Sequence, residues 1–195
     1  MAKVFEAIDE RLAEWIGGQH VFFVATAPSG GSAGDAGYVN LSPKGLSCFR
    51  ILAPTEVAYL DLVGSGAETI AHLRENHRIT FMFCAFEGPP KILRLYGEGR
   101  VLEPGDAEFE TLRASFPPYQ ATRAIIHARL TRIADSCGYG VPKLAYQGER
   151  TQMRDWADRK GDEGIRRYQL LNNQTSIDGL PALRAETLGK LEGDP

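Results

Sequence analysis

The sequence predicts an α+β protein, mainly β, in which an antiparallel barrel carries helices around it. Five or six short apolar runs, rich in β-branched and aromatic residues, follow one another at the length of strands. Helical patterns lie between some of these runs, but they do not alternate regularly with them as a parallel doubly wound sheet would require. The 195 residues, 43% of them hydrophobic, suit one domain or a domain with a modest appendage.

The first half of the chain is expected to hold one helix and three strands. Residues 3–16 place apolar side chains on one helical face, and a Gly-Gly pair ends the pattern. Residues 21–26 are a β-branched and aromatic run that is too short for a helix. Residues 28–37, rich in Gly, Ser and Asp, indicate a hairpin loop that leads to a second strand at about 37–42. Residues 56–63 form the third strand.

The second half continues with helices between strands. Residues 66–76 have helical spacing, and residues 79–86 are apolar on both faces, which predicts a central position in the sheet. Residues 92–102 alternate, and their glycines indicate a bend or a close approach of two backbones. A helix near 105–115 follows. The alternating residues 124–133 predict the final strand.

The end of the chain is expected to differ from the rest. Residues 149–171 look mainly helical and a loop-like tail follows them. We therefore predict two parts: residues 1–139, which hold the barrel and the N-terminal helix, and residues 140–195, a helical extension packed on the barrel or against a partner.

Composition argues against several classes of protein. The net charge of −3 does not favour nucleic-acid binding, and no apolar run reaches the ~18 residues of a membrane span. The charged N-terminus lacks the apolar core of a signal peptide, so we expect a cytoplasmic protein. Three widely spaced cysteines form neither a disulfide framework nor a metal motif, and His72 and His77 do not share a helix face. No metal site is expected.

Polar side chains gather at the end of the second strand. Asn40 and Ser42 share one face by alternation, and Pro43 indicates a strand end or edge just before Lys44. A lysine in a turn is usually only solvated. Behind two polar residues, however, Lys44 can act on a phosphate as a mobile point charge. The sequence thus points to an anion site at this strand end.

No other phosphate or nucleophile motif stands out. The chain contains neither a Gly-x-Ser-x-Gly elbow nor a Walker-type loop. Arg50 and Arg78 are the alternatives to Lys44, because a guanidinium can hold a phosphate in a bidentate fork.

The Gly-Ser-Gly sequence at 64–66 admits two interpretations. Ser65 precedes a helical pattern and Glu68 follows three residues later, which is a capping box worth about 1 kcal/mol. Alternatively, Gly66 and its neighbours expose backbone N–H groups at a positive helix end, where an anion is favoured. Glu68 counts against the second interpretation because its carboxylate would repel a phosphate.

The loop at 137–142 is also unusual. Its Cys-Gly-Tyr-Gly-Val-Pro sequence can be a tight turn with a buried thiol. It can also be a lid over a flat ligand, with Tyr139 stacking on that ligand.

The order of these segments resembles the pyridoxamine 5′-phosphate oxidase-like family of FMN-binding split β-barrels over roughly residues 15–135. The residues that carry the resemblance are the strand at 21–26, Asn-Leu-Ser-Pro-Lys-Gly at 40–45, Ala-Tyr-Leu-Asp at 58–61, Gly-Ser-Gly at 64–66 and Leu-Arg-Glu-Asn-His-Arg-Ile at 73–79. Segments 83–90, 136–142 and 173–181 resemble an uncharacterised subfamily more narrowly. The resemblance implies an antiparallel split β-barrel with flanking helices and a helical C-terminal extension.

It also implies a homodimer with two FMN sites at the subunit interface. In the family, a basic strand segment and a Gly-Ser-Arg-Lys-type turn hold the phosphate; here Glu68 and Thr69 replace the basic pair of that turn. Ser42, Lys44 and Thr69 are then expected to bind the phosphate of FMN. Arg94 or Tyr96 is expected to come from the partner subunit. With Tyr139 of the possible lid, the expected FMN-binding residues are Asn40, Leu41, Ser42, Pro43, Lys44, Tyr59, Leu60, Asp61, Ser65, Gly66, Glu68, Thr69, Arg94 and Tyr139.

The resemblance implies an FMN-dependent oxidoreductase that acts on a small molecule, in which the flavin carries the chemistry. The substrate-gripping set of the true oxidases is absent apart from a weak echo at Tyr119 and Arg123, so pyridoxamine phosphate is not the expected substrate. No side chain is assigned a catalytic role. The alternatives are a non-catalytic flavin carrier or redox sensor, and a deazaflavin or haem ligand, which related split barrels hold.

Overall fold

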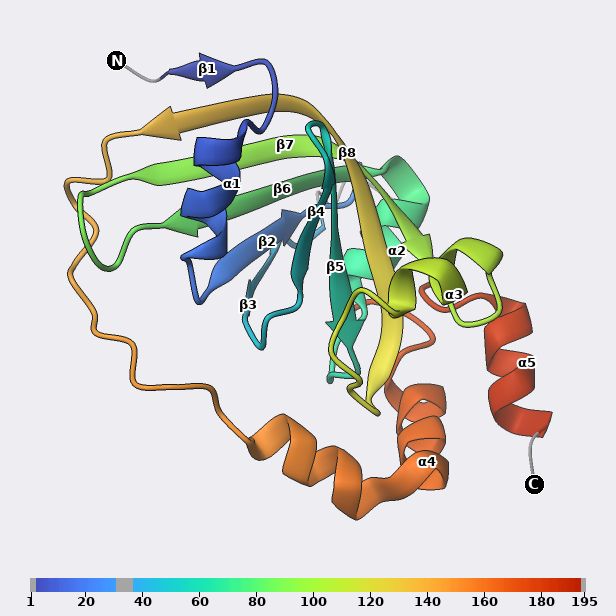
Figure 1. Ribbon diagram of the computed structural model, residues 1–195. Coiled ribbons are helices and arrows are strands. Elements are labelled where there is room, and N and C mark those ends of the chain that lie inside the picture. Colours follow the sequence, from blue (N-terminus) through green and yellow to red (C-terminus); the bar gives the residue numbers. More distant parts are fainter. Residues whose placement is uncertain (1–2, 31–36, 194–195) are drawn as a thin grey trace.

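The computed structural model describes residues 3–30 and 37–193. One antiparallel sheet organises this part of the chain (Figure 1). Along the chain its strands are β1 (Val4–Phe5), β2 (Phe22–Thr26), β3 (Asn40–Lys44), β4 (Phe49–Ala53), β5 (Glu56–Leu62), β6 (Arg78–Cys84), β7 (Ile92–Leu102) and β8 (Thr122–Ser136). In space their order is β3-β2-β6-β7-β8-β5-β4, and β1 pairs with the far end of β8.

The sheet curls until its two ends face each other. Figure 1 shows β4 and β5 crossing in front of β2 and β6. The ring of Phe49 on β4 lies 5.1 Å from that of Phe22 on β2 and 5.1 Å from that of Phe83 on β6. No ladder joins the edge strands β3 and β4 in the described residues. The protein is therefore the split antiparallel barrel that the sequence predicts.

Five helices surround the barrel: α1 (Glu10–Gly17), α2 (Glu68–Asn76), α3 (Ala107–Arg113), α4 (Gln152–Asn172) and α5 (Ala185–Gly193). The Asp9 side chain caps α1 by accepting a hydrogen bond from the Leu12 amide at 2.7 Å. Helix α4 kinks at Gly161, whose φ of 61° is unsuited to a helix. Among the described helices, none is both long enough and apolar enough to cross a lipid bilayer.

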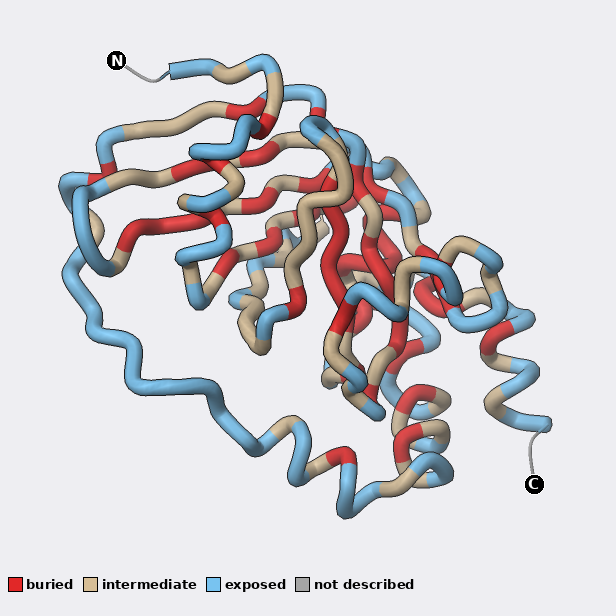
Figure 2. The backbone as a smooth tube through the Cα atoms, in the orientation of Figure 1, coloured by how far each residue is buried: buried red, intermediate tan, exposed pale blue. Residues whose placement is uncertain are grey.

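The main core fills the inside of the curled sheet, where Figure 2 shows most of the buried backbone. Phe81 and Leu95 are fully buried there, and α1 and α2 close it with Leu12 and Ile70. Ala182, far along the chain, also belongs to this core. The residues after β8 thus return to the barrel. Whether residues 1–139 and 140–195 are separate units stays a prediction.

Three expectations about the elements are wrong. Residues 3–16 are not one helix, because Val4–Phe5 pairs with β8 as β1 and α1 begins only at Glu10. The strand expected at 37–42 runs from Asn40 to Lys44, straight through Pro43. An edge strand tolerates this proline because the missing N–H is not needed on its open side. The loop-like tail contains α5, and β4 was not expected at all.

An extended segment, residues 141–150, connects the end of β8 to α4 (Figure 1). All but the first of its residues are exposed, as the pale blue stretch in Figure 2 shows. It has few ties to the barrel. The Leu144 amide donates to the Phe86 carbonyl at 3.0 Å, and the rings of Tyr146 and His20 stack 3.6 Å apart.

Candidate functional site

A cavity of about 750 Å³ lies where the end of β3 meets the loop before α2, and we call it the β3–α2 cavity. One wall comes from β3, a second from the 64–66 loop and a third from residues 171–177, at the end of α4 and just after it. The expected site residues that line it are Ser42, Pro43, Lys44, Ser65, Gly66 and Glu68. Two separate stretches singled out in the sequence therefore converge.

Beneath this cavity, Asp61 lies between two cations. Its Oδ2 accepts two hydrogen bonds from Arg123, at 2.9 and 2.7 Å, and its Oδ1 lies 3.5 Å from the Lys44 ammonium. Burial would raise the pKa of Asp61, but attraction to Arg123 and Lys44 outweighs it and lowers the pKa. Two cations facing one carboxylate leave an excess positive charge, and Lys44 is the more exposed of the two.

A hydrogen-bonded network stands behind the β3 wall. Ser42 donates to the Asn40 side-chain oxygen at 3.0 Å. The Asn40 amide nitrogen donates to the hydroxyls of Thr26 and Thr69, at 3.0 and 2.9 Å. Thr26 in turn contacts His72 Nδ1 at 3.0 Å. These polar groups are satisfied among themselves, so they fix the shape of the wall and are not free donors.

The start of α2 is not the capping box that the sequence predicts. The N-cap residue is Ala67, and no side chain caps the helix there. The Glu68 carboxylate accepts a hydrogen bond from the Ile177 amide at 3.3 Å and leans against Gly66, where any Cβ would collide with it. Glu68 therefore fastens the third wall of the cavity, and Ser65 remains exposed at its rim.

Tyr59 and Leu60 are fully buried on opposite faces of β5. The Lys44 ammonium lies 5.7 Å from the centre of the Tyr59 ring. The Tyr59 hydroxyl is buried without a well-formed hydrogen bond to any described residue. Burial, with a further contribution from Asp61, raises the pKa of this phenol well above its ordinary value, so it stays a protonated donor. Leu60 packs in a second core and does not reach the cavity.

The remaining candidates lie elsewhere in this chain. Leu41 points outward from the edge strand and is 61% exposed. Arg94 donates to the Ser136 hydroxyl at 3.1 Å, and Tyr139 is 82% exposed. The two alternative arginines are engaged by backbone carbonyls: Arg50 by Ser115, Ser47 and Phe49, and Arg78 by Ala27 and Pro28.

Two parts of the cavity were missed as binding elements in the sequence. Arg123 appeared there only as a weak echo of a substrate residue, whereas its guanidinium spans Asp61 and the Gly66 carbonyl. The wall at 171–177 includes Ser176 and Ile177, within the segment 173–181 that had stood out without a role. No group of His, Cys, Asp and Glu side chains in the described residues has the arrangement of a metal site.

The donors of the cavity fit a phosphate group on one side. Lys44 lines the cavity on this side and supplies the positive charge. On the α2 side the cavity is lined by the Glu68 carboxylate. An anion is therefore favoured beside β3 and disfavoured at the helix start.

Comparison with known proteins gives the family of this chain. A family model described as "Pyridoxamine 5'-phosphate oxidase" matches residues 8–137. The chain belongs to this family. A curated member, the "Pyridoxamine 5'-phosphate oxidase family protein ustO" of Aspergillus flavus, is 36% identical over 205 aligned residues, which cover 96% of this chain and 80% of the relative.

Some solved structures resemble the fold of the present protein. HupZ of Group A Streptococcus has a TM-score of 0.50 at 17% identity, covering 71% of this chain and 99% of its own. A protein of Mesorhizobium loti, described as FAD-binding, has a TM-score of 0.48 at 11% identity and covers 69% of this chain and 96% of its own. At such identities the likeness concerns the fold alone.

Proposed function

We propose that this protein binds FMN in the β3–α2 cavity and acts as a flavin-dependent oxidoreductase on a small molecule other than pyridoxamine phosphate. The observation that carries the proposal is the cluster in which two cations, Lys44 and Arg123, share the single carboxylate of Asp61 at the β3 side of a 750 Å³ cavity. Cofactor pockets of globular proteins commonly measure 300–1,000 Å³. Bound flavin would supply the hydride or electron transfer.

In this proposal the chain's own residues bind and orient. Lys44 faces the phosphate, and Asp61 holds both Lys44 and Arg123 in place. The network behind Ser42 and Asn40 keeps the β3 wall rigid. Glu68 keeps the anion on the β3 side of the cavity by repulsion.

We further propose a homodimer that completes the site. Phe23, Met82 and Arg94 stand side by side on the outer face of the sheet and are half-buried. Helices α1 and α2 pack on the inner face of the sheet, where they close the core. They therefore do not cover these three side chains on the outer face. Next to them, Leu41 on the edge strand is 61% exposed. A partly apolar sheet face with an exposed edge favours a second copy, which could bring its Arg94 to the cavity.

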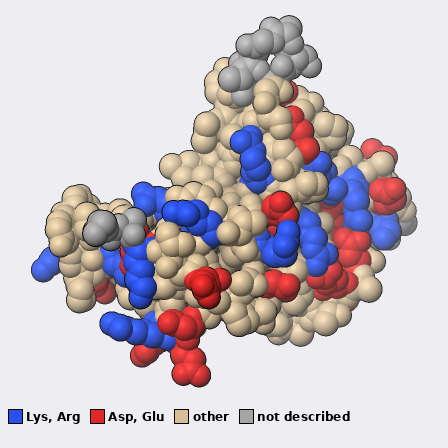
Figure 3. All heavy atoms as spheres, turned by 90° about the horizontal axis from the view of Figure 1, so that it is seen from above, with Lys and Arg blue, Asp and Glu red and all other residues tan. Residues whose placement is uncertain are grey.

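The surface and the cysteines agree with a small-molecule function in the cytoplasm. On the face shown in Figure 3, basic and acidic side chains are interspersed and do not gather into a basic stripe. Such a stripe is the usual mark of nucleic-acid binding. Cys48, Cys84 and Cys137 are all free thiols, in keeping with a reducing compartment.

Titration of the purified protein with FMN tests the binding proposal. Binding should quench the fluorescence of FMN. At a concentration 100 times its dissociation constant, FMN should raise the free energy of unfolding by about 2.7 kcal/mol. Lys44→Ala should weaken FMN by about 1–3 kcal/mol through loss of a charge-assisted contact. Lys143→Ala, which changes an exposed lysine, is the matched control.

Glu68→Gln provides the opposite test, because removing the carboxylate should strengthen FMN binding. Equal affinity in all three variants would exclude the β3–α2 cavity as the phosphate site. If FMN binds but NADH, NADPH and common electron acceptors give no turnover, the flavin carrier or redox sensor replaces the oxidoreductase.

A further inference from the structure

A second cavity of about 310 Å³ lies between α1 and β4, and it shares no lining residue with the β3–α2 cavity. We call it the α1–β4 cavity. Its floor is the half-buried ring of Phe49, which packs on the buried rings of Phe22 and Phe83 beneath it with centroids 5.1 Å away. Cys48 adds an apolar wall, since burial raises the pKa of its thiol to about 12 and keeps it neutral. The floor is suited to an apolar or aromatic group.

The rim of this cavity carries one cation, Arg50. Its Nε and Nη1 donate to carbonyls of Ser115, Ser47 and Phe49, at 2.6 to 2.9 Å. These bonds fix the direction of the guanidinium, and its Nη2 makes no hydrogen bond to a described residue. Arg50 has no ion-pair partner in the described parts of the chain. A fixed guanidinium with a free edge is suited to a carboxylate.

The rim also carries one carboxylate, that of Glu149 at the end of the extended segment. Its Oε2 accepts a hydrogen bond from the Leu46 amide at 3.3 Å. Within residues 3–30 and 37–193 the Glu149 carboxylate forms no ion pair. It and Arg50 therefore do not neutralise each other. The cavity therefore presents separate charges of opposite sign above one apolar floor.

Arg50 and Glu149 both bind the backbone of the turn between β3 and β4, which is held in an unfavourable conformation. Leu46 and Ser47 have φ values of 59° and 52°, which non-glycine residues seldom adopt. Three side chains hold the turn: Arg50 contacts the Ser47 carbonyl, Tyr119 donates to the Leu46 carbonyl at 3.2 Å, and Glu149 accepts from the Leu46 amide. Strain of this kind persists only where the surroundings enforce it, and it clusters at ligand sites.

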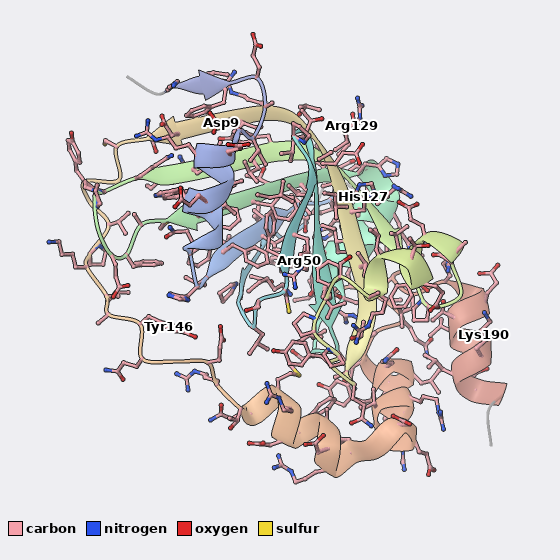
Figure 4. All side chains as sticks on the ribbon, viewed as in Figure 1. Asp9, Arg50, His127, Arg129, Tyr146 and Lys190 are labelled. Atoms are coloured by element: carbon pink, nitrogen blue, oxygen red, sulfur yellow. The ribbon has the colours of Figure 1, made fainter. Side chains whose placement is uncertain are left out.

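At the mouth, the rings of His20 and Tyr146 stack 3.6 Å apart with an angle of 6° between their planes. Figure 4 labels Arg50 near the middle of the barrel and Tyr146 on the extended segment, both below α1 in this view. His20 lines the α1–β4 cavity, and Tyr146 lines an adjoining cavity that also contains His20. A flat pair of rings here adds to the aromatic character of the floor.

We propose that the α1–β4 cavity binds a small zwitterion with an apolar or aromatic body, of the α-amino acid class. Its carboxylate meets the free edge of Arg50, its ammonium meets Glu149, and its body lies on Phe49. The volume is at the lower end for ligand pockets and suits a molecule of this size. The inference does not depend on flavin binding, because the two cavities are lined by different residues.

Calorimetric titration of the full chain tests this inference with three probes. L-phenylalanine carries both charges, 3-phenylpropionate lacks the ammonium group, and phenethylamine lacks the carboxylate. L-phenylalanine should bind, and each analogue should bind at least ~10-fold more weakly, which corresponds to about 1.4 kcal/mol. No binding of L-phenylalanine at millimolar concentration, or equal binding of the three probes, overturns the proposal.

Variants then place the ligand in the cavity. Glu149→Gln changes an exposed side chain, so it should fold, and it should weaken L-phenylalanine ~10-fold while leaving 3-phenylpropionate unchanged. Glu163→Gln, an exposed glutamate on α4, is the matched control and should change neither. Lys44→Ala in the β3–α2 cavity should also leave L-phenylalanine binding unchanged. Unaltered affinity in Glu149→Gln, or a loss in Lys44→Ala, overturns the assignment.

Discussion

His72 on α2 and Asp178 in the segment after α4 form a buried pair, with Nε2 and Oδ2 3.1 Å apart. The Thr26 hydroxyl, which accepts a hydrogen bond from the Asn40 amide, lies 3.0 Å from His72 Nδ1 on the other side of the ring. A single chain of hydrogen bonds thus ties the β3 wall of the cavity to the segment that forms its third wall.

Asp178→Ala should lower the free energy of unfolding by about 1–3 kcal/mol, because it leaves the buried His72 donor and the Tyr38 amide without their acceptor. Asp178→Asn keeps an acceptor oxygen and should lose ~1 kcal/mol or less. Urea denaturation measures both, with the exposed Asp158→Ala as control. An Asp178→Ala variant as stable as the parent would mean that the segment is not anchored through His72.

Asp61 predicts how stability changes in acid. Arg123 and Lys44 hold its folded pKa below the ordinary value, so its stabilising effect is complete above about pH 4 and is lost as pH falls toward the folded pKa. The free energy of unfolding of the parent should therefore fall more steeply below pH 4 than that of Asp61→Asn.

At neutral pH the same variant should be less stable by about 3–5 kcal/mol, because it leaves the Arg123 guanidinium buried without a counter-charge. Denaturant titrations from pH 7 to pH 3 measure both effects. Parallel curves for the two proteins would show that Asp61 is not held ionised by this cluster.

Local signals in the sequence were sufficient for most of the barrel. The strands β2, β5, β6, β7 and β8 are runs whose own pattern marks them. β4 was missed because Arg50 interrupts its apolar run and only its pairing with β5 makes it a strand. β1 was missed for the same kind of reason: two residues become a strand by contact with β8, over a hundred residues away.

The candidate site divides in the same way. The polar residues at 40–44 and the loop at 64–66 are local patterns, and they do converge on one cavity. The pairing of Asp61 with Arg123 spans 62 residues, and Glu68 contacts Ile177 across 109, so no short-range signal announces either. Ser65 and Glu68 match the sequence pattern of a capping box. In the structure, however, the Glu68 carboxylate binds the Ile177 amide of the C-terminal segment, and no side chain caps the helix.

The cysteines should differ in reactivity. Burial raises the pKa of Cys48 to about 12 and also raises that of Cys84, whereas Cys137 is exposed. Because the thiolate is the nucleophile, iodoacetamide at pH 8 should alkylate Cys137 first in the folded protein. Mass spectrometry of peptides after a timed reaction measures this order. Cys48 should react only after denaturation, and early labelling of Cys48 would show that its thiol is not buried in the folded protein.

A glycine substitution in β7 tests its packing on β8, and a second one in α5 serves as the comparison. The backbone of Gly97 lies at a β-bulge, and a Cβ there would meet the Arg129 carbonyl oxygen well inside van der Waals contact. Gly97→Ala should therefore destabilise the protein by about 1–3 kcal/mol through overpacking. Gly189, inside α5, has no atom within 4 Å of such a Cβ, so Gly189→Ala should gain up to about 1 kcal/mol from helix propensity. Thermal unfolding of the pair should shift in opposite directions, and a Gly97→Ala variant that melts at or above the parent's temperature would contradict the close approach of the two strands.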